Sequence, residues 1–225
     1  MNNPGGKGAI YQQLINLMPP HEVYIETHLG GGAVIRHKRP ASSNIGIEKD
    51  PKIIALWEKH QPLSFKLVND DDDTYNFLSN YKYTGSELLY CDPPYLQSTR
   101  KACERKLYRY DYSLDDHSML LQLLRSLPCK VMISGYESVL YKEMLPNWYT
   151  HTYQSVCHSG MGIEWVWMNY PAPIELHDYR YLGDTFRERE RIKRKINRWV
   201  ANLKSMPVLE RQALLLAMRH FCEKT

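Results

Sequence analysis

The sequence lacks any long apolar run. None of its hydrophobic stretches approaches the roughly 20 residues that cross a membrane as a helix. Its beginning, Met1-Asn2-Asn3-Pro4-Gly5, also lacks the basic-then-apolar pattern of a secretory signal. We therefore expect a cytoplasmic protein that does not act at a membrane.

Paired cysteines are lacking too. The five cysteines are scattered, with no Cys-x-x-Cys pair and no Cys/His cluster at the spacing of a zinc site. This pattern predicts reduced, packing cysteines and no bound metal. It also excludes a fold that depends on disulfides.

Charge of one sign is not in large excess, since the formal net charge is +4 over 225 residues. Its distribution is uneven, however. Residues 180–198 hold eight Lys/Arg against three acids, and residues 96–111 hold five against two, so these two stretches together carry +8. Two basic stretches on a neutral-to-acidic body are typical of a phosphate-backbone footprint. A solvated helix face is the alternative for the first of them.

One apolar run, residues 88–91, ends abruptly in Asp92-Pro93-Pro94-Tyr95. Proline fixes its own φ, lacks an N–H and restricts the residue before it, so the segment should hold its carbonyls unpaired at the end of a buried strand. A carboxylate, free carbonyls and an aromatic ring then converge. Such a set suits a planar group that bears an amine. An ordinary strand-ending turn is the alternative.

Two glycine-rich segments precede this motif. Pro4-Gly5-Gly6-Lys7-Gly8 leads into a helical apolar pattern at 10–18, and its backbone N–H groups with Lys7 suit an anion. Gly30-Gly31-Gly32 follows a short strand and opens a helix, where open α/β sheets bind ligands. Its spacing differs from the dinucleotide fingerprint, which argues against a dehydrogenase. Glu48 ends the next strand, at a position suited to ribose hydroxyls.

Strands and helices alternate along the first three quarters of the chain. The expected strands lie at 23–26, 44–48, 65–69, 87–91 and 130–134, followed by a hairpin of 149–156 and 163–169. The pattern predicts an α/β fold, a Rossmann-like doubly wound sheet with a C-terminal antiparallel hairpin. From about residue 183 the chain becomes helical, with a break at Pro207. We predict two domains, residues 1–178 and a basic helical extension, 179–225.

The order of these parts resembles the Dam-like family of DNA adenine-N6 methyltransferases. The resemblance rests on Pro4-Gly5-Gly6-Lys7, residues 26–32, Glu48 and Asp92-Pro93-Pro94-Tyr95, and it extends over residues 4–171 to a last strand at 164–170. Thr27 and His28 stand where the family has proline and an aromatic residue, and Glu48 stands where aspartate is usual. The C-terminal extension is not part of the shared region.

The resemblance implies S-adenosylmethionine as the methyl donor and S-adenosylhomocysteine as its product, in the cytoplasm of a bacterial or phage-infected cell. An acid of the run 70–73 would lie near the cofactor's adenine, and the spacing to Phe77-Leu78 favours Asp73; a helix N-terminus is the other interpretation of this run. The cofactor-binding residues are then Gly6, Lys7, His28, Leu29, Gly30, Gly31, Gly32, Glu48, Asp73 and Asp92.

The catalytic residues implied are Asp92, Pro93, Pro94 and Tyr95. The amine of adenine is a poor nucleophile because its lone pair is delocalised into the ring. Acceptance of its hydrogens by Asp92 and by the Pro93 carbonyl should localise that pair, while Tyr95 stacks on a base flipped out of the duplex. Direct transfer then needs no covalent enzyme intermediate.

DNA is the expected partner, contacted by cations interleaved with aromatic rings and by the basic helix. The predicted contacts are Arg100, Lys101, Arg105, Lys106, Tyr108, Arg109, Arg191, Lys193, Arg194 and Lys195. Rival assignments are transfer to N4 of cytosine or to adenine in RNA, and a catalytically inactive nucleic-acid-binding protein of the same fold.

Only 19 positions separate Asp73 from Asp92, where Dam-like enzymes place a target-recognition region. Sequence reading should therefore be minimal, supplied by residues 97–111, the hairpin tip at 157–162 and the basic extension. Because phosphate contacts position a protein without specifying sequence, we expect methylation of adenine in short or relaxed contexts. The recognition sequence, the oligomeric state and the biological role (restriction-modification, phage protection or replication marking) stay open.

Overall fold

The computed structural model describes residues 7–60, 62–69, 74–100, 109–157 and 160–222. Six predicted site residues lie outside this part of the chain: Gly6, Asp73, Lys101, Arg105, Lys106 and Tyr108. The chain divides into two compact units, Met1–Asp178 and Tyr179–Thr225.

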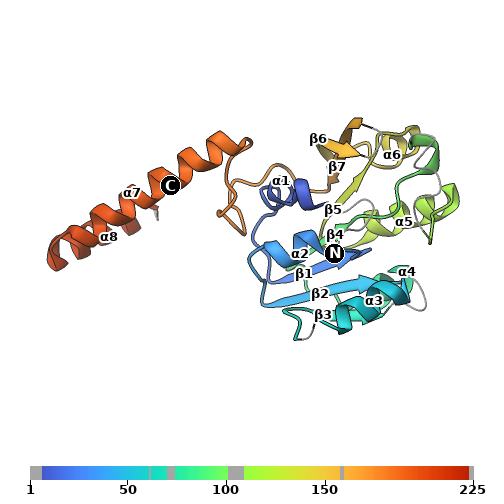
Figure 1. Ribbon diagram of the computed structural model, residues 1–225, viewed down its shortest axis with the longest axis horizontal. Helices are drawn as coiled ribbons and strands as arrows, with labels where there is room; N and C mark the ends of the chain where they lie inside the picture. The colour runs from blue at the N-terminus through green and yellow to red at the C-terminus, as the bar shows by residue number, and fades with distance from the viewer. Residues whose placement is uncertain (1–6, 61, 70–73, 101–108, 158–159, 223–225) are drawn as a thin grey trace. The chain divides into compact units, whose positions relative to one another are not determined.

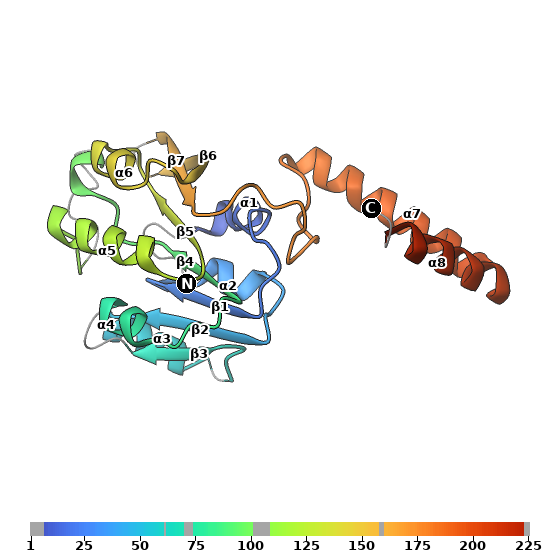
Figure 2. The same cartoon turned by 180° about the vertical axis from the view of Figure 1, so that it is seen from behind.

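The first unit is built on a seven-stranded sheet in the order β3-β2-β1-β4-β5-β7-β6, which can be followed in both views (Figures 1 and 2). The strands are β1 (Val23–Thr27), β2 (Ser43–Glu48), β3 (Lys66–Asn69), β4 (Glu87–Cys91), β5 (Lys130–Gly135), β6 (Tyr149–Cys157) and β7 (Gly160–Met168). The first five are parallel, and β7 runs antiparallel to both β5 and β6. This strand order is that of a Rossmann-like methyltransferase sheet with a C-terminal antiparallel hairpin, so the predicted fold class is confirmed.

Helices cover both faces of the sheet. They are α1 (Tyr11–Ile15), α2 (Ala33–His37), α3 (Pro51–Glu58), α4 (Thr74–Asn80), α5 (Leu114–Ser126) and α6 (Val139–Met144), with short 3₁₀ turns η1 (Lys7–Ala9) and η2 (Gln97–Thr99). Leucines of α5 and Tyr141 of α6 pack on Ile25, Leu89 and Val131. Side chains alternate along strands, so the neighbouring Leu88 faces the other side, where it is also buried. Burial on both faces explains the apolar character of β4.

Two helix ends lie near a proline. Pro51 begins α3 behind Asp50, whose side chain accepts the Lys52 N–H as an N-cap. The apolar pattern at 10–18, in contrast, gives only a short α1 that ends at Ile15. After Ile15 the chain tightens into turns in which the Leu17 N–H donates to the Leu14 carbonyl and the Met18 N–H to the Ile15 carbonyl, before Pro19-Pro20.

The second unit contains α7 (Phe186–Ser205) and α8 (Val208–Cys222), with Pro207 between them as predicted. Thr185 caps α7 by accepting the Glu188 N–H at 3.1 Å. Neither helix buries a residue. Within the described ranges no helix is long and apolar enough to cross a membrane, and no group of three or more His, Cys, Asp or Glu side chains could hold a metal ion.

Candidate active site

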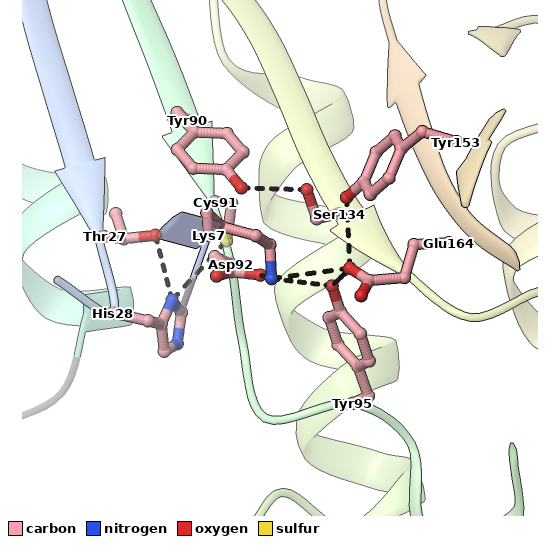
Figure 3. Close-up of polar contacts among 10 residues, drawn as sticks. All are labelled: Lys7, Thr27, His28, Tyr90, Cys91, Asp92, Tyr95, Ser134, Tyr153 and Glu164. Atoms are coloured by element: carbon pink, nitrogen blue, oxygen red, sulfur yellow. Dashed lines mark hydrogen bonds and ion pairs between the residues drawn. The ribbon is translucent and has the colours of Figure 1, made fainter. Parts of the chain in front are cut away.

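Three neighbouring parallel strands end at one edge of the sheet. β2 ends at Glu48, and Thr27 at the end of β1 pairs in register with Cys91 at the end of β4. The residues that follow, His28 and Asp92, therefore leave the sheet at adjacent positions (Figure 3). This is the edge at which open α/β sheets bind ligands.

A cavity of about 420 Å³ opens at this edge. Its volume lies within the range of small-molecule sites, roughly 300–1,000 Å³. Every predicted cofactor-binding residue that the structure describes lines it: Lys7, His28, Leu29, Gly30, Gly31, Gly32, Glu48 and Asp92. Pro93 and Pro94 line the cavity as well, so the two predicted sites share one space.

The glycine turn is held from two sides. Its Gly30 N–H donates to Glu48 Oε2 at 2.7 Å, and Trp57 Nε1 donates to the Gly30 carbonyl at 2.9 Å. Gly32 has a φ of 56°, and a Cβ there would lie 2.8 Å from the Trp57 ring. This position therefore requires glycine, and its backbone lines the cavity without a side chain. The contact of Trp57 with the glycine turn was not predicted from the sequence.

Glu48 is buried and accepts three backbone N–H groups. Besides Gly30, the amides of Lys49 and Asp50 donate to its Oε1, each at 2.9 Å. Burial raises the pKa of Glu48, and these three hydrogen bonds oppose the rise. A carboxylate offers about four lone-pair positions, so roughly one is left for a ligand hydroxyl.

His28 is fixed in an unusual backbone conformation. Its φ is 58°, in the left-handed region that non-glycine residues seldom adopt. The ring is held by Thr27 Oγ1 at 3.0 Å from Nδ1 and by the Tyr112 hydroxyl at 2.9 Å from Nε2. Burial lowers the pKa of His28 to about 3, with His117 and Lys49 adding to the effect, so the imidazole is neutral at pH 7.

Lys7 ties the start of the chain to the end of β4 (Figure 3). Its Nζ lies 2.7 Å from Asp92 Oδ1 and 3.6 Å from Glu164 Oε2, and it donates to the Tyr95 hydroxyl at 2.8 Å. The Tyr95 hydroxyl donates to Glu164, which also accepts from the Tyr153 hydroxyl at 3.1 Å. One buried polar network thus joins η1, the Asp-Pro-Pro-Tyr motif and the hairpin strands.

The charges in this network depend on one another. Burial raises the pKa of Asp92 and so does Glu164, whereas Lys7 lowers it. Burial opposes the charged form of Lys7, but Asp92 and Glu164 outweigh it and raise the pKa of the ammonium above its usual value. Lys7 is therefore protonated, and it favours the ionised form of Asp92.

Tyr95 lies behind the wall of the cavity. Its ring is buried and packs edge-on against Tyr136 at 4.8 Å between centroids, and it does not line the cavity. The predicted stacking of Tyr95 on a base stays a prediction. The structure adds a tether at the hydroxyl, which the motif alone did not indicate.

Sequence reasoning missed two acids. Glu26 lines the cavity, accepts the Tyr24 hydroxyl at 2.9 Å, and has its pKa raised to about 8 by burial. Glu164 lies in β7, in the apolar run Glu164-Trp165-Val166-Trp167-Met168. A lone acid in such a run was the available signal, because a buried carboxylate needs a partner.

The described nucleic-acid candidates are Arg100 and Arg109 in the first unit and four cations in α7 of the second. Arg100 is only 5% exposed and its Nη1 donates to Asp111 at 2.9 Å, so its guanidinium is held in a largely buried pair and the predicted phosphate contact does not fit. Arg109 lines the cavity and lies 3.4 Å from Asp50, with about half of its side chain exposed. The α7 candidates are all exposed: Arg191, Lys193, Arg194 and Lys195.

No protein-family model and no curated protein matches the sequence. Solved structures are similar in fold. A structure of M. capricolum TrmK in complex with S-adenosyl-homocysteine shares 9% identity over 95% of this chain and 96% of that chain, with a TM-score of 0.47. The 23S rRNA methyltransferase ErmE shares 14% identity over 78% and 72%, also at 0.47. A dimethyladenosine transferase from Plasmodium falciparum shares 8% over 75% and 64%, again at 0.47.

Proposed function

We propose that this protein transfers a methyl group from S-adenosylmethionine to the N6 amine of adenine in DNA, with short or relaxed sequence specificity. The observation that carries the proposal is the shared cavity. Asp92, Pro93 and Pro94 line the same space as the glycine turn and Glu48. An acceptor set for an amine therefore adjoins a pocket of cofactor size.

The residues present fit the cofactor. The turn at Gly32 admits no side chain, and Glu48 keeps acceptor capacity beside it for a ribose hydroxyl. Leu29 and Ile53 add apolar lining, and Lys49 with Lys52 adds positive charge. When bound, S-adenosylmethionine supplies an electrophilic methyl group.

The acceptors at the end of β4 are suited to activating the amine. Asp92 accepts one hydrogen of the amine and the Pro93 carbonyl accepts the other, which localises the nitrogen lone pair. Lys7 holds the Asp92 carboxylate at 2.7 Å and stabilises its ionised form. The side chain then acts as a preorganised acceptor in a largely buried site, where such interactions are strongest.

Transfer of labelled methyl groups to mixed-sequence DNA and RNA tests the proposal, with Asp92→Ala as the inactive control. We expect labelled N6-methyladenine in DNA and a loss of about 100-fold or more in the variant. Label on cytosine or in RNA would favour the rival substrates. Binding of nucleic acid without any transfer would favour an inactive protein of this fold.

For the second unit we propose contacts with the phosphate backbone. The four predicted cations of α7, all exposed, lie on a helix that carries eight Lys/Arg against two Glu between Phe186 and Ser205. Two of them face acids on the same helix, at 3.4 Å for Arg191–Glu188 and 3.9 Å for Lys193–Glu190. Exposed pairs of this kind are weak, so these cations stay available to phosphates.

Replacing the four α7 cations by glutamine should weaken DNA binding and reduce its salt dependence. Each lost phosphate contact removes roughly 0.9 from the slope of log K against log salt. The comparison is a fluorescence-anisotropy titration at several salt concentrations. The matched control replaces four exposed cations of the first unit: Lys59, Lys66, Lys82 and Arg125. Equal slopes for the two variants would contradict a role of α7.

The relaxed specificity rests on the short interval before Asp92. Between Thr74 and Asp92 the structure describes only α4, a connecting segment and β4, with no inserted domain among these residues. A base-resolution methylation map should show adenines modified in short contexts. A single long, strictly defined site would refute this part of the proposal.

A further inference from the structure

Glu164 does not line the cavity, yet it is joined to the residues that do. Its Oε2 lies 3.6 Å from Lys7 Nζ and accepts hydrogen bonds from the hydroxyls of Tyr95 and Tyr153. Lys7 thus faces two carboxylates, Asp92 at the site and Glu164 behind it (Figure 3). A side chain about 10% exposed with three polar partners is not a solvated surface acid.

We propose that Glu164 is a positioning residue that shares Lys7 with Asp92 and holds Tyr95, so that Asp92 is a stronger hydrogen-bond acceptor toward the amine. The inference rests on the function proposed above and extends it to the hairpin. A lysine paired with one buried acid neutralises that acid. With the second carboxylate, the Lys7 ammonium is shared between two acids, so it cancels less of the charge on Asp92.

The direction of the effect follows from the surrounding charges. The titratable groups that face Asp92 are Lys7, Tyr24, Glu26, Tyr90, Cys91, Tyr95, Tyr141, Tyr153 and Glu164. Burial raises the pKa values of the tyrosines and of the cysteine, so these groups are neutral near pH 7. Lys7 lowers the pKa of Asp92, and Glu164 raises it. Removing the Glu164 charge therefore makes Asp92 a weaker base and a weaker hydrogen-bond acceptor.

The test is the pH dependence of single-turnover methyl transfer in Glu164→Gln, which keeps the size of the side chain and an acceptor oxygen. We expect the plateau rate to fall about tenfold or more, while the acidic limb moves to lower pH by about one unit or more. Glu143→Gln makes the same change at an exposed position of α6 and should leave both unchanged. S-adenosylmethionine affinity, measured by calorimetry, should stay within about threefold.

The outcomes are distinct. The inference is overturned if Glu164→Gln keeps both the plateau rate and the acidic limb of the wild type. It is also overturned if the plateau rate falls while the acidic limb stays in place or moves to higher pH. If Glu164→Gln does not fold, Glu164→Asp keeps the charge and should keep the limb, and a shifted limb there would also overturn it. A wild-type protein that transfers no methyl group would refute the proposed function itself, before any variant is compared.

Discussion

Replacing Lys7 by methionine keeps an unbranched side chain of similar length but removes the charge between two largely buried carboxylates. Lys7 is 6% exposed, and the side chains of Asp92 and Glu164 are 18% and 10% exposed. Breaking a buried ion pair by removing one partner costs roughly 3–5 kcal/mol, because the remaining charge is left uncompensated. For a chain of this size roughly 2–4 °C of Tm correspond to 1 kcal/mol, so we expect Tm to fall by about 6–20 °C.

The loss of unfolding free energy in Lys7→Met should increase as the pH rises. Burial and Glu164 raise the folded-state pKa of Asp92, and only Lys7 opposes them strongly, so Lys7→Met raises it further. A carboxyl whose folded pKa is above its unfolded value of ~3.9 destabilises the fold increasingly as pH rises through that interval. The difference in unfolding free energy between Lys7→Met and wild type should therefore be smaller near pH 5 than near pH 8.

Urea unfolding followed by circular dichroism at both pH values measures this difference. The matched control is Lys142→Met, which breaks an ion pair with Glu137 at the same 2.7 Å, but between side chains that are 63% and 42% exposed. That exposed pair should contribute at most about 1 kcal/mol. A loss in Lys7→Met no larger than in the control, or equal at the two pH values, would refute the reasoning.

Two further predictions concern the glycine turn and the buried histidines. Gly32→Ala should lower the free energy of unfolding by about 1–3 kcal/mol and S-adenosylmethionine affinity, measured by calorimetry, by about tenfold or more, since φ is 56° and the new Cβ meets Trp57 at 2.8 Å. The control is Gly8→Ala, where a Cβ has nothing within 4 Å and both quantities should stay unchanged. Equal effects of the two variants would contradict the role of the turn. Burial lowers the pKa of His21 to about 3, so stability should be lost as pH falls from its unfolded value of ~6.5 towards 3. His21→Phe, which keeps a ring against His177, should flatten this dependence in urea unfolding, and an unchanged slope would count against it.

The sheet was predictable because its signals are local. β4 begins at Glu87 and ends at Cys91 as predicted, since an apolar run meets Asp92 and two prolines. The hairpin was visible for the same reason, although β6 and β7 each extend further toward the tip than expected. The helix predicted from the pattern at 10–18 forms but ends at Ile15, because helical spacing of apolar residues also occurs in tight turns that pack on a sheet.

The cavity residues were predictable from motif order, whereas their partners were not. Glycines and acids at strand ends converge in any parallel sheet, which is enough to bring Gly30, Glu48 and Asp92 together. No local sequence signal indicates that Lys7 pairs with Asp92, 85 positions away, or that Arg100 pairs with Asp111. Such ion pairs form between segments that are distant in the sequence and meet only in the folded chain. Charge patterning alone therefore overestimates the number of cations available to bind phosphate.

The β6–β7 hairpin has two different positions of interest, its tip and the Tyr153–Glu164 pair further along the strands. Tyr153 of β6 and Glu164 of β7 are paired directly across the strands, four pairs from the end pair Cys157 and Gly160. Cross-strand partners lie on the same face, so both side chains reach the Lys7 network together. We propose that changes near the tip alter which DNA sequence is read, while changes at the Tyr153–Glu164 pair act on Asp92. If the proposals hold, tip variants change the methylation map at constant rate, and Glu164 variants change the rate at a constant map.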